Sequence, residues 1–151
     1  MQYRLIQLKL YMDNLSIEFD MSTYSGRKRA QQAVYLGQMA GADIGFPFGM
    51  YLTGPYSPEL MKALIKLEDN LWDEEYKEYE LHDYLDGILN KIKDLMNVPE
   101  QVELSQAEWL ELVASAVYFS NDNKCQDDNE LKRVFLKDRG SLPIYINNAI
   151  L

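Results

Sequence analysis

The sequence has almost no cysteine or histidine, with one of each in 151 residues. A lone cysteine cannot form an internal disulfide, and a zinc site needs several cysteine or histidine ligands at a fixed spacing. Cys-His catalysis is disfavoured as well, because His82 is predicted at a helix start and Cys125 in a polar, acidic linker. A reactive thiolate needs electropositive surroundings instead. We therefore expect no metal site and no cysteine-based catalysis.

Other chemical signatures are missing too. The glycines between residues 41 and 54 match neither the GxGxxG pattern nor the P-loop, so no phosphate-binding loop is predicted. Carboxylates are plentiful, but nothing in the sequence pairs two of them for acid-base catalysis. Long apolar runs are absent, and Arg4 and Lys9 interrupt the apolar residues near the start, so neither a membrane span nor a signal peptide is predicted. With a single cysteine, this pattern favours a cytoplasmic protein that is not an enzyme and uses no cofactor.

Basic residues are in the minority, with 15 Lys and Arg against 24 Asp and Glu, a net charge of −9. A DNA-binding domain normally neutralises phosphates with a basic face, so nucleic acid is not the expected partner. The one basic cluster, Arg27, Lys28 and Arg29, is the candidate for nucleic-acid contact. The acidity itself suits a basic partner or a mimic of nucleic acid, although solubility is its more common purpose.

What is present is an ordinary globular balance, with 47% hydrophobic and 26% charged residues. The length fits one domain with a single core. Apolar residues recur at three- and four-residue spacing, which predicts about six helices. These begin near residues 2, 27, 58, 83, 106 and 131.

The most recognisable stretch runs from residue 46 to residue 71. In the segment 46–52, Phe46, Phe48 and Met50 occupy alternate positions, which predicts an extended segment with one face inward. The residues 53–56 that follow are a turn signal. Ser57 is a natural N-cap, Pro58 suits the first helical position, and Glu59 complements the helix dipole. We therefore expect a leucine-rich helix that begins at this point.

An acidic stretch follows that helix. Between Glu68 and Glu80 lie seven acidic residues and one lysine, interleaved with Trp72, Tyr76 and Tyr79. Residues 76–81 alternate loosely and are a candidate strand of a small hairpin. Two interpretations remain open: a surface for a basic partner, or a solvated loop whose aromatic rings tuck back, which is the more common case.

Several motifs follow one another along the chain, namely Val34-Tyr35-Leu36, the aromatic segment 46–52, Gly54-Pro55-Tyr56-Ser57-Pro58, the helix 60–71, and the segments 110–119 and 129–137. This order resembles the YwgA-like family of small bacterial and phage proteins, which is distantly similar to the Panacea-domain (SocA-like) antitoxins. The resemblance spans residues 27–140, and the Gly-Pro-Tyr-Ser-Pro run is its sharpest part.

The resemblance and the helical pattern together imply a mainly α fold with a small β-hairpin. The expected arrangement is a single helical domain over residues 1–151, with a winged-helix-like core at about 27–82 and a helical C-terminal part at 83–151. Panacea domains act by holding a partner protein. The resemblance thus implies a non-enzymatic binding module that neutralises a toxin or host defence protein, of phage or mobile-element origin.

The residues expected to meet such a partner are aromatic or acidic, namely Tyr51, Tyr56, Trp72, Glu74, Glu75, Tyr76 and Glu78. A homodimer is compatible with the sequence. The alternative is a winged-helix DNA-binding regulator that uses the basic cluster and the helix after Pro58. That helix carries only Lys62 and Lys66, and the expected wing at 72–81 is acidic, so DNA recognition has less support.

Overall fold

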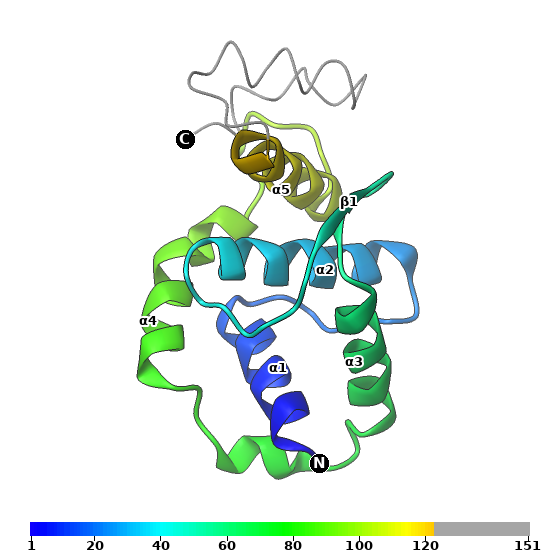
Figure 1. Ribbon diagram of the computed structural model, residues 1–151, viewed down its shortest axis with the longest axis vertical. Helices are drawn as coiled ribbons and strands as arrows, with labels where there is room; N and C mark the ends of the chain where they lie inside the picture. Colours follow the sequence, from blue (N-terminus) through cyan, green and yellow to red (C-terminus); the bar gives the residue numbers. More distant parts are fainter. Residues whose placement is uncertain (123–151) are drawn as a thin grey trace.

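The computed structural model describes residues 1–122, which form a mainly helical fold with one small β-hairpin (Figure 1). The predicted fold class is thereby confirmed. The described elements are α1 (Tyr3–Asn14), α2 (Tyr24–Met39), β1 (Gly49–Tyr51), β2 (Gly54–Tyr56), α3 (Pro58–Asp69), the 3-10 helix η1 (Glu74–Glu78), α4 (Asp83–Ile92), the 3-10 helix η2 (Lys93–Met96) and α5 (Gln106–Asp122). The predicted sixth helix and Cys125 lie outside the described residues.

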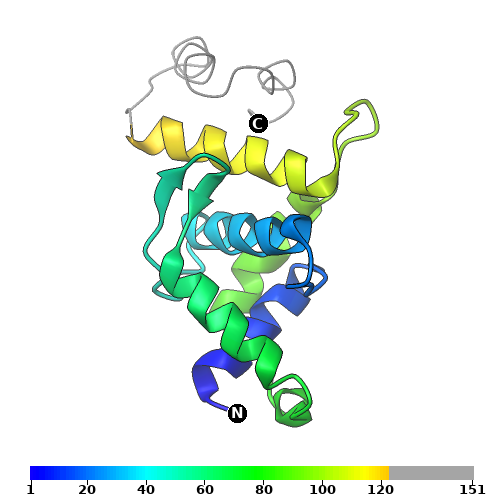
Figure 2. The same ribbon diagram turned by 90° about the vertical axis from the view of Figure 1, so that its right-hand side faces the viewer.

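Helix α2 crosses the middle of the molecule, with α5 on one side and α1, α3 and α4 on the other (Figures 1 and 2). Its inner positions carry small side chains, and Ala30, Ala33 and Val34 are almost fully buried. Small residues let neighbouring helices approach closely, which suits a helix that packs on several sides. In α5, every residue from Leu110 to Ala116 is buried, so this helix is covered all round.

Helices α2 and α5 lie side by side and run in the same direction (Figure 2). Lys28 pairs with Glu111, and two turns further on the Tyr35 ring lies 6.2 Å from the Tyr118 ring. Both pairs have the same offset along the chain, as expected of parallel helices in a constant register. The contact therefore joins the middle of the chain to its last described helix.

The start of α2 differs from the prediction. The helix begins at Tyr24 and not at Arg27, because the Thr23 hydroxyl caps it by accepting a hydrogen bond from the Gly26 amide at 2.9 Å. Gly26 lies in the first turn of α2, and a Cβ at this position would overlap the carbonyl oxygen of Asp20. Its role is close packing. Lys28 and Arg29 consequently lie beyond the first turn, where the helix dipole has little effect.

The hairpin is not at residues 76–81, so the prediction of a hairpin strand there is wrong. Residues 74–78 form η1, since Asp73 caps it by accepting from the Glu75 amide at 3.1 Å. The strands are instead β1 and β2, paired antiparallel with Met50 opposite Pro55. Gly54, expected in the turn, starts β2 with a positive φ of 101° that favours glycine.

Other helix ends follow the sequence closely. The Ser57 hydroxyl accepts from the Leu60 amide at 3.2 Å and caps α3 as predicted. Ser105 and Glu108 form a capping box, each side chain accepting from the other's amide at 3.2 Å. Helix α4 begins at Asp83, close to the expected position, and is capped by His82.

Candidate functional site

Two buried glutamines of α2 hold the ends of the extended segment before α3. The Gln38 amide group donates to the Phe46 carbonyl at 2.9 Å, and its oxygen accepts from the Phe46 amide at 3.0 Å and the Ile44 amide at 3.3 Å. The Gln31 amide group makes the same two-way contact with the backbone of Ser57, at 2.9 and 3.0 Å. These side chains satisfy buried backbone groups as a neighbouring strand would. They position the hairpin against α2.

A third glutamine, Gln32, lies beneath the hairpin turn. Its nitrogen donates to the Thr53 carbonyl at 2.9 Å, whereas its oxygen is buried and has no hydrogen-bond partner among residues 1–122. A Cβ on Gly54 would come within 2.8 Å of the Gln32 nitrogen, so glycine is favoured there by space as well as by φ. The hairpin turn is therefore seated directly on the Gln32 side chain.

Sequence reasoning missed these glutamines. The sequence does contain a signal for these two side chains. Gln31 and Gln38 are seven residues apart and share a face of α2 with alanine and valine. A polar pair on an apolar helical stripe indicates side chains that have buried partners.

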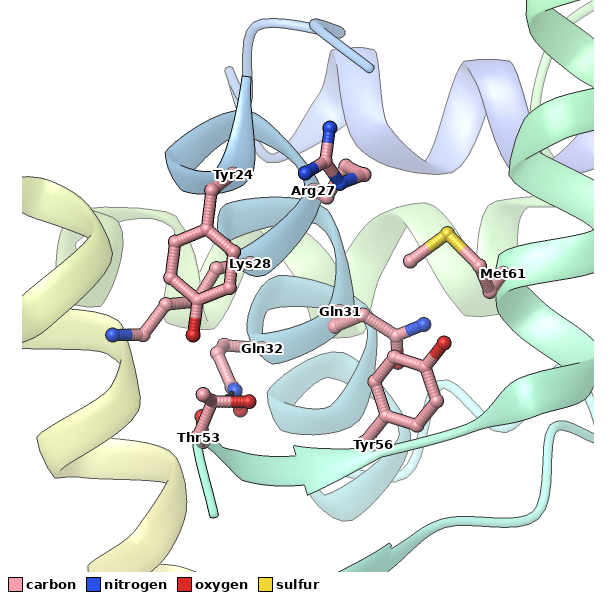
Figure 3. Close-up of a pocket in the computed structure, with 8 residues that line it drawn as sticks. All are labelled: Tyr24, Arg27, Lys28, Gln31, Gln32, Thr53, Tyr56 and Met61. Atoms are coloured by element: carbon pink, nitrogen blue, oxygen red, sulfur yellow. Dashed lines mark hydrogen bonds between the residues drawn. The ribbon is translucent and has the colours of Figure 1, made fainter. Parts of the chain in front are cut away.

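A pocket of about 230 Å³ opens between the first half of α2, the hairpin and the start of α3 (Figure 3). We call it the α2 pocket. The Tyr24 and Tyr56 rings flank it, and Arg27 lies toward the N-terminal end of α2 (Figure 3). Its lining residues are Tyr24, Arg27, Lys28, Gln31, Gln32, Thr53, Tyr56 and Met61. The structure thus brings Tyr56, a predicted partner contact, together with two residues of the basic cluster.

The three basic residues do not form one exposed basic face. The Lys28 ammonium lies 3.1 Å from the Glu111 carboxylate, and the two side chains are only 12% and 8% exposed. The Arg29 Nε is buried without a hydrogen-bond partner among the described residues. Arg27 Nη1 donates to the Met21 carbonyl at 3.0 Å. Arg27 and Lys28 line the pocket, and Lys28 is paired with Glu111. Arg27 has no carboxylate within ion-pair distance among residues 1–122.

The predicted aromatic and acidic contacts around η1 lie at the other end of α3. Trp72 is 80% exposed, although its indole nitrogen donates to the Asp69 carbonyl at 3.0 Å. Tyr76 is half-buried, with the Lys9 ammonium 5.3 Å from its ring centre. The Trp72 indole therefore projects from the surface in a defined orientation.

The carboxylates of this stretch differ in their pairing. Glu74 forms an exposed ion pair with Lys77 at 2.7 Å. Glu75 lies 3.1 Å from the Met1 amino group, and the hydrogen bond from the same amino group lowers the pKa of Asp73. Glu78 is exposed and has no ion pair within the described part of the chain.

The predicted contacts fall into two separate groups. Tyr51 and Tyr56 pack edge to face on the hairpin, with ring centres 5.0 Å apart. Helix α3 separates them from the residues around η1, and its 12 residues span about 18 Å at 1.5 Å per residue (Figure 1). One compact site cannot contain both groups.

Among residues 1–122, no three or more His, Cys, Asp or Glu side chains are placed to hold a metal ion. None of the helices in this part of the chain is long and apolar enough to cross a membrane. The fold and its surface define a mainly helical domain with a small hairpin. No protein-family model matches the chain, and neither does any of the curated proteins or solved structures compared with it.

Proposed function

We propose that this protein is a non-enzymatic binding module that occludes a basic partner protein through residues 72–78, the acidic segment. The observation that carries the proposal is Trp72, a large aromatic side chain that is 80% exposed and yet oriented by its bond to Asp69. Tryptophan is enriched among the residues that dominate binding energy. An indole already held in place loses less conformational entropy on binding.

The charge around Trp72 supports a basic partner. Residues 68–80 contain seven of the 24 acidic residues of the chain and one lysine. Such a potential attracts a basic surface and speeds its encounter, and salt weakens the attraction. A basic protein would therefore be favoured over an acidic or apolar one.

The resemblance to YwgA-like proteins and Panacea-domain antitoxins supports a toxin or host defence factor as the partner. Under this proposal the partner is a toxin or host defence factor, and the complex forms in the cytoplasm. Inhibition would then follow from coverage of the partner's surface, with no chemical step.

Replacement of Trp72 tests the proposal. We expect Trp72→Ala to weaken binding of a basic partner about thirtyfold, a loss of about 2 kcal/mol that is typical of a central interface residue. A partner captured from host lysate by the full chain would be purified and titrated by calorimetry. The second tryptophan, Trp109, is buried, so protection from acrylamide quenching on binding would report on Trp72.

The matched control is Tyr84→Ala, which removes an aromatic side chain that is 64% exposed on α4, outside the acidic segment. It should leave the affinity unchanged. Charge reversal of Glu74, Glu75 and Glu78 should slow association. The proposal fails if Trp72→Ala binds as tightly as the unmodified chain, or if both aromatic variants weaken binding equally.

The alternative, a winged-helix DNA-binding regulator, has less support. The basic cluster is divided between a buried ion pair and separate contacts, and the hairpin precedes α3 whereas a wing would follow the recognition helix. A gel shift with nonspecific duplex at low salt separates the two functions. Strong, salt-sensitive retardation would favour the regulator, because nonspecific affinity is mainly electrostatic.

A further inference from the structure

We propose that the α2 pocket binds a small organic acid that carries a ring and a single carboxylate. This site is independent of the acidic segment, which lies beyond the far end of α3. The inference rests on the size of the pocket, on one arginine and on the side chains that form its walls.

The size admits a ring and a carboxylate, and little more. The pocket holds about 230 Å³. A protein cavity of about 150 Å³ accommodates a benzene molecule, so the remaining space fits a carboxylate group. Drug-sized ligands need roughly 300 Å³ or more, so part of such a ligand would extend out of the pocket.

The charge of the pocket selects an anion. Lys28 is neutralised by Glu111, whereas no carboxylate of residues 1–122 lies within ion-pair distance of Arg27. A guanidinium has five N–H donors, and Arg27 uses one of them on the Met21 carbonyl. The planar group can therefore accept a carboxylate in bidentate geometry.

The walls select a ring. Tyr24 and Tyr56 present aromatic faces, and Met61 adds a flexible thioether (Figure 3). The oxygen and nitrogen of the Gln31 amide already bond to the Ser57 backbone, so this buried side chain adds little polar attraction for a ligand.

The end of the pocket at the hairpin turn disfavours a second anionic group. The carbonyl oxygen of Gln32 is buried there without a hydrogen-bond donor among the described residues. That oxygen is an acceptor with a partial negative charge, so it disfavours a second carboxylate more than an uncharged ring. A monocarboxylate, bound with its charge toward Arg27, is the expected ligand.

Benzoate and benzamide provide a matched pair of probes, because they have the same ring and shape and differ in charge. We would titrate each into the 15N-labelled full chain and follow the backbone amide signals. Benzoate should shift the signals of Gln31, Gln32, Thr53 and Tyr56 and should bind at least about tenfold more tightly than benzamide, since a charged hydrogen bond is much the stronger. N-acetyl-phenylalanine tests whether the ring and carboxylate come from the end of a peptide, in which case it binds more tightly than benzoate.

Arg27→Gln should lower the affinity for benzoate about tenfold, to the level of benzamide. Lys62→Gln is the control, because it makes the same change in net charge at an exposed position on α3 outside the pocket. Arg27→Lys keeps the charge and should retain intermediate affinity, which separates loss of charge from misfolding. Equal affinity for benzoate and benzamide, or undiminished benzoate binding by Arg27→Gln, would overturn the proposal.

Discussion

A close fit between single residues lies where α1 meets α2. Gly37 faces the Tyr11 side chain, and a Cβ on Gly37 would overlap the Tyr11 hydroxyl. That hydroxyl donates to the Ala42 carbonyl at 2.8 Å, so it cannot simply move aside. The glycine thus makes room for a buried hydrogen bond between distant parts of the chain.

Gly37→Ala should destabilise the protein by about 2 to 3 kcal/mol, because overpacking forces side chains out of their preferred positions. Urea unfolding measures the change. Gly87→Ala is the control, since nothing lies within 4 Å of a Cβ there, and it should stabilise α4 by up to about 1 kcal/mol. Addition of Tyr11→Phe should recover part of the loss in Gly37→Ala, and no recovery would argue that the clash lies elsewhere.

The pH dependence of stability gives a second prediction for Tyr11. Burial, aided by the nearby Asp43, raises the pKa of its hydroxyl above the usual value of 10. Above that pH the unfolded chain loses this proton more readily than the folded chain, so stability present below pH 10 is lost as the pH rises further. Unfolding between pH 8 and 11 should show a steeper decline for the unmodified chain than for Tyr11→Phe. Parallel curves would contradict the assignment.

At the scale of the elements, the parallel pair α2 and α5 contains a buried charged contact within an apolar interface. Lys28 and Glu111 have left water together, and the Lys28 ammonium depends on the Glu111 carboxylate for compensation. Ser115, one turn beyond Glu111, has a buried hydroxyl oxygen without a partner in the described part of the chain. Such a polar layer favours one register between two helices, because a shift would separate the charges.

Removal of one member of this ion pair should therefore lower the free energy of unfolding more than removal of both. We expect Glu111→Leu to lose about 3 kcal/mol of stability, because Lys28 is left buried and unpaired, and the double variant with Lys28→Met to lose less. A double-mutant cycle by chemical denaturation measures the coupling. The exposed pair Glu74 and Lys77 serves as the control, and its disruption should have no measurable effect. Coupling of equal size in both pairs would contradict the prediction.

At the scale of the whole molecule, the two proposed sites have opposite charge and lie apart. The acidic segment follows α3, whereas the α2 pocket borders the start of that helix (Figure 1). Arg27 thus provides a local cation in a chain of net charge −9. Because exposed charges are screened within about 10 Å at ordinary ionic strength, a small anion can bind the pocket without disturbing a basic partner.

Part of this structure follows from short-range signals in the sequence. Ser57 with Pro58, and Ser105 with Glu108, mark helix starts because a cap depends on residues three positions apart. The three- and four-residue spacing of apolar positions marks the helices for the same reason. The mainly helical class and the acidity of residues 68–80 could therefore be predicted directly from the sequence.

What only the tertiary structure decided depends on contacts between distant residues. Gln38 bonds to the backbone of residue 46, and Gln31 bonds to the backbone of residue 57. Lys28 forms an ion pair with Glu111, 83 positions away. No local pattern predicts such partners, because they exist only once α2 packs against the hairpin and α5. The sequence by itself determined which segments become helices and where the charge lies. Packing decided which cations are neutralised, where the hairpin sits and that a pocket opens beside Arg27.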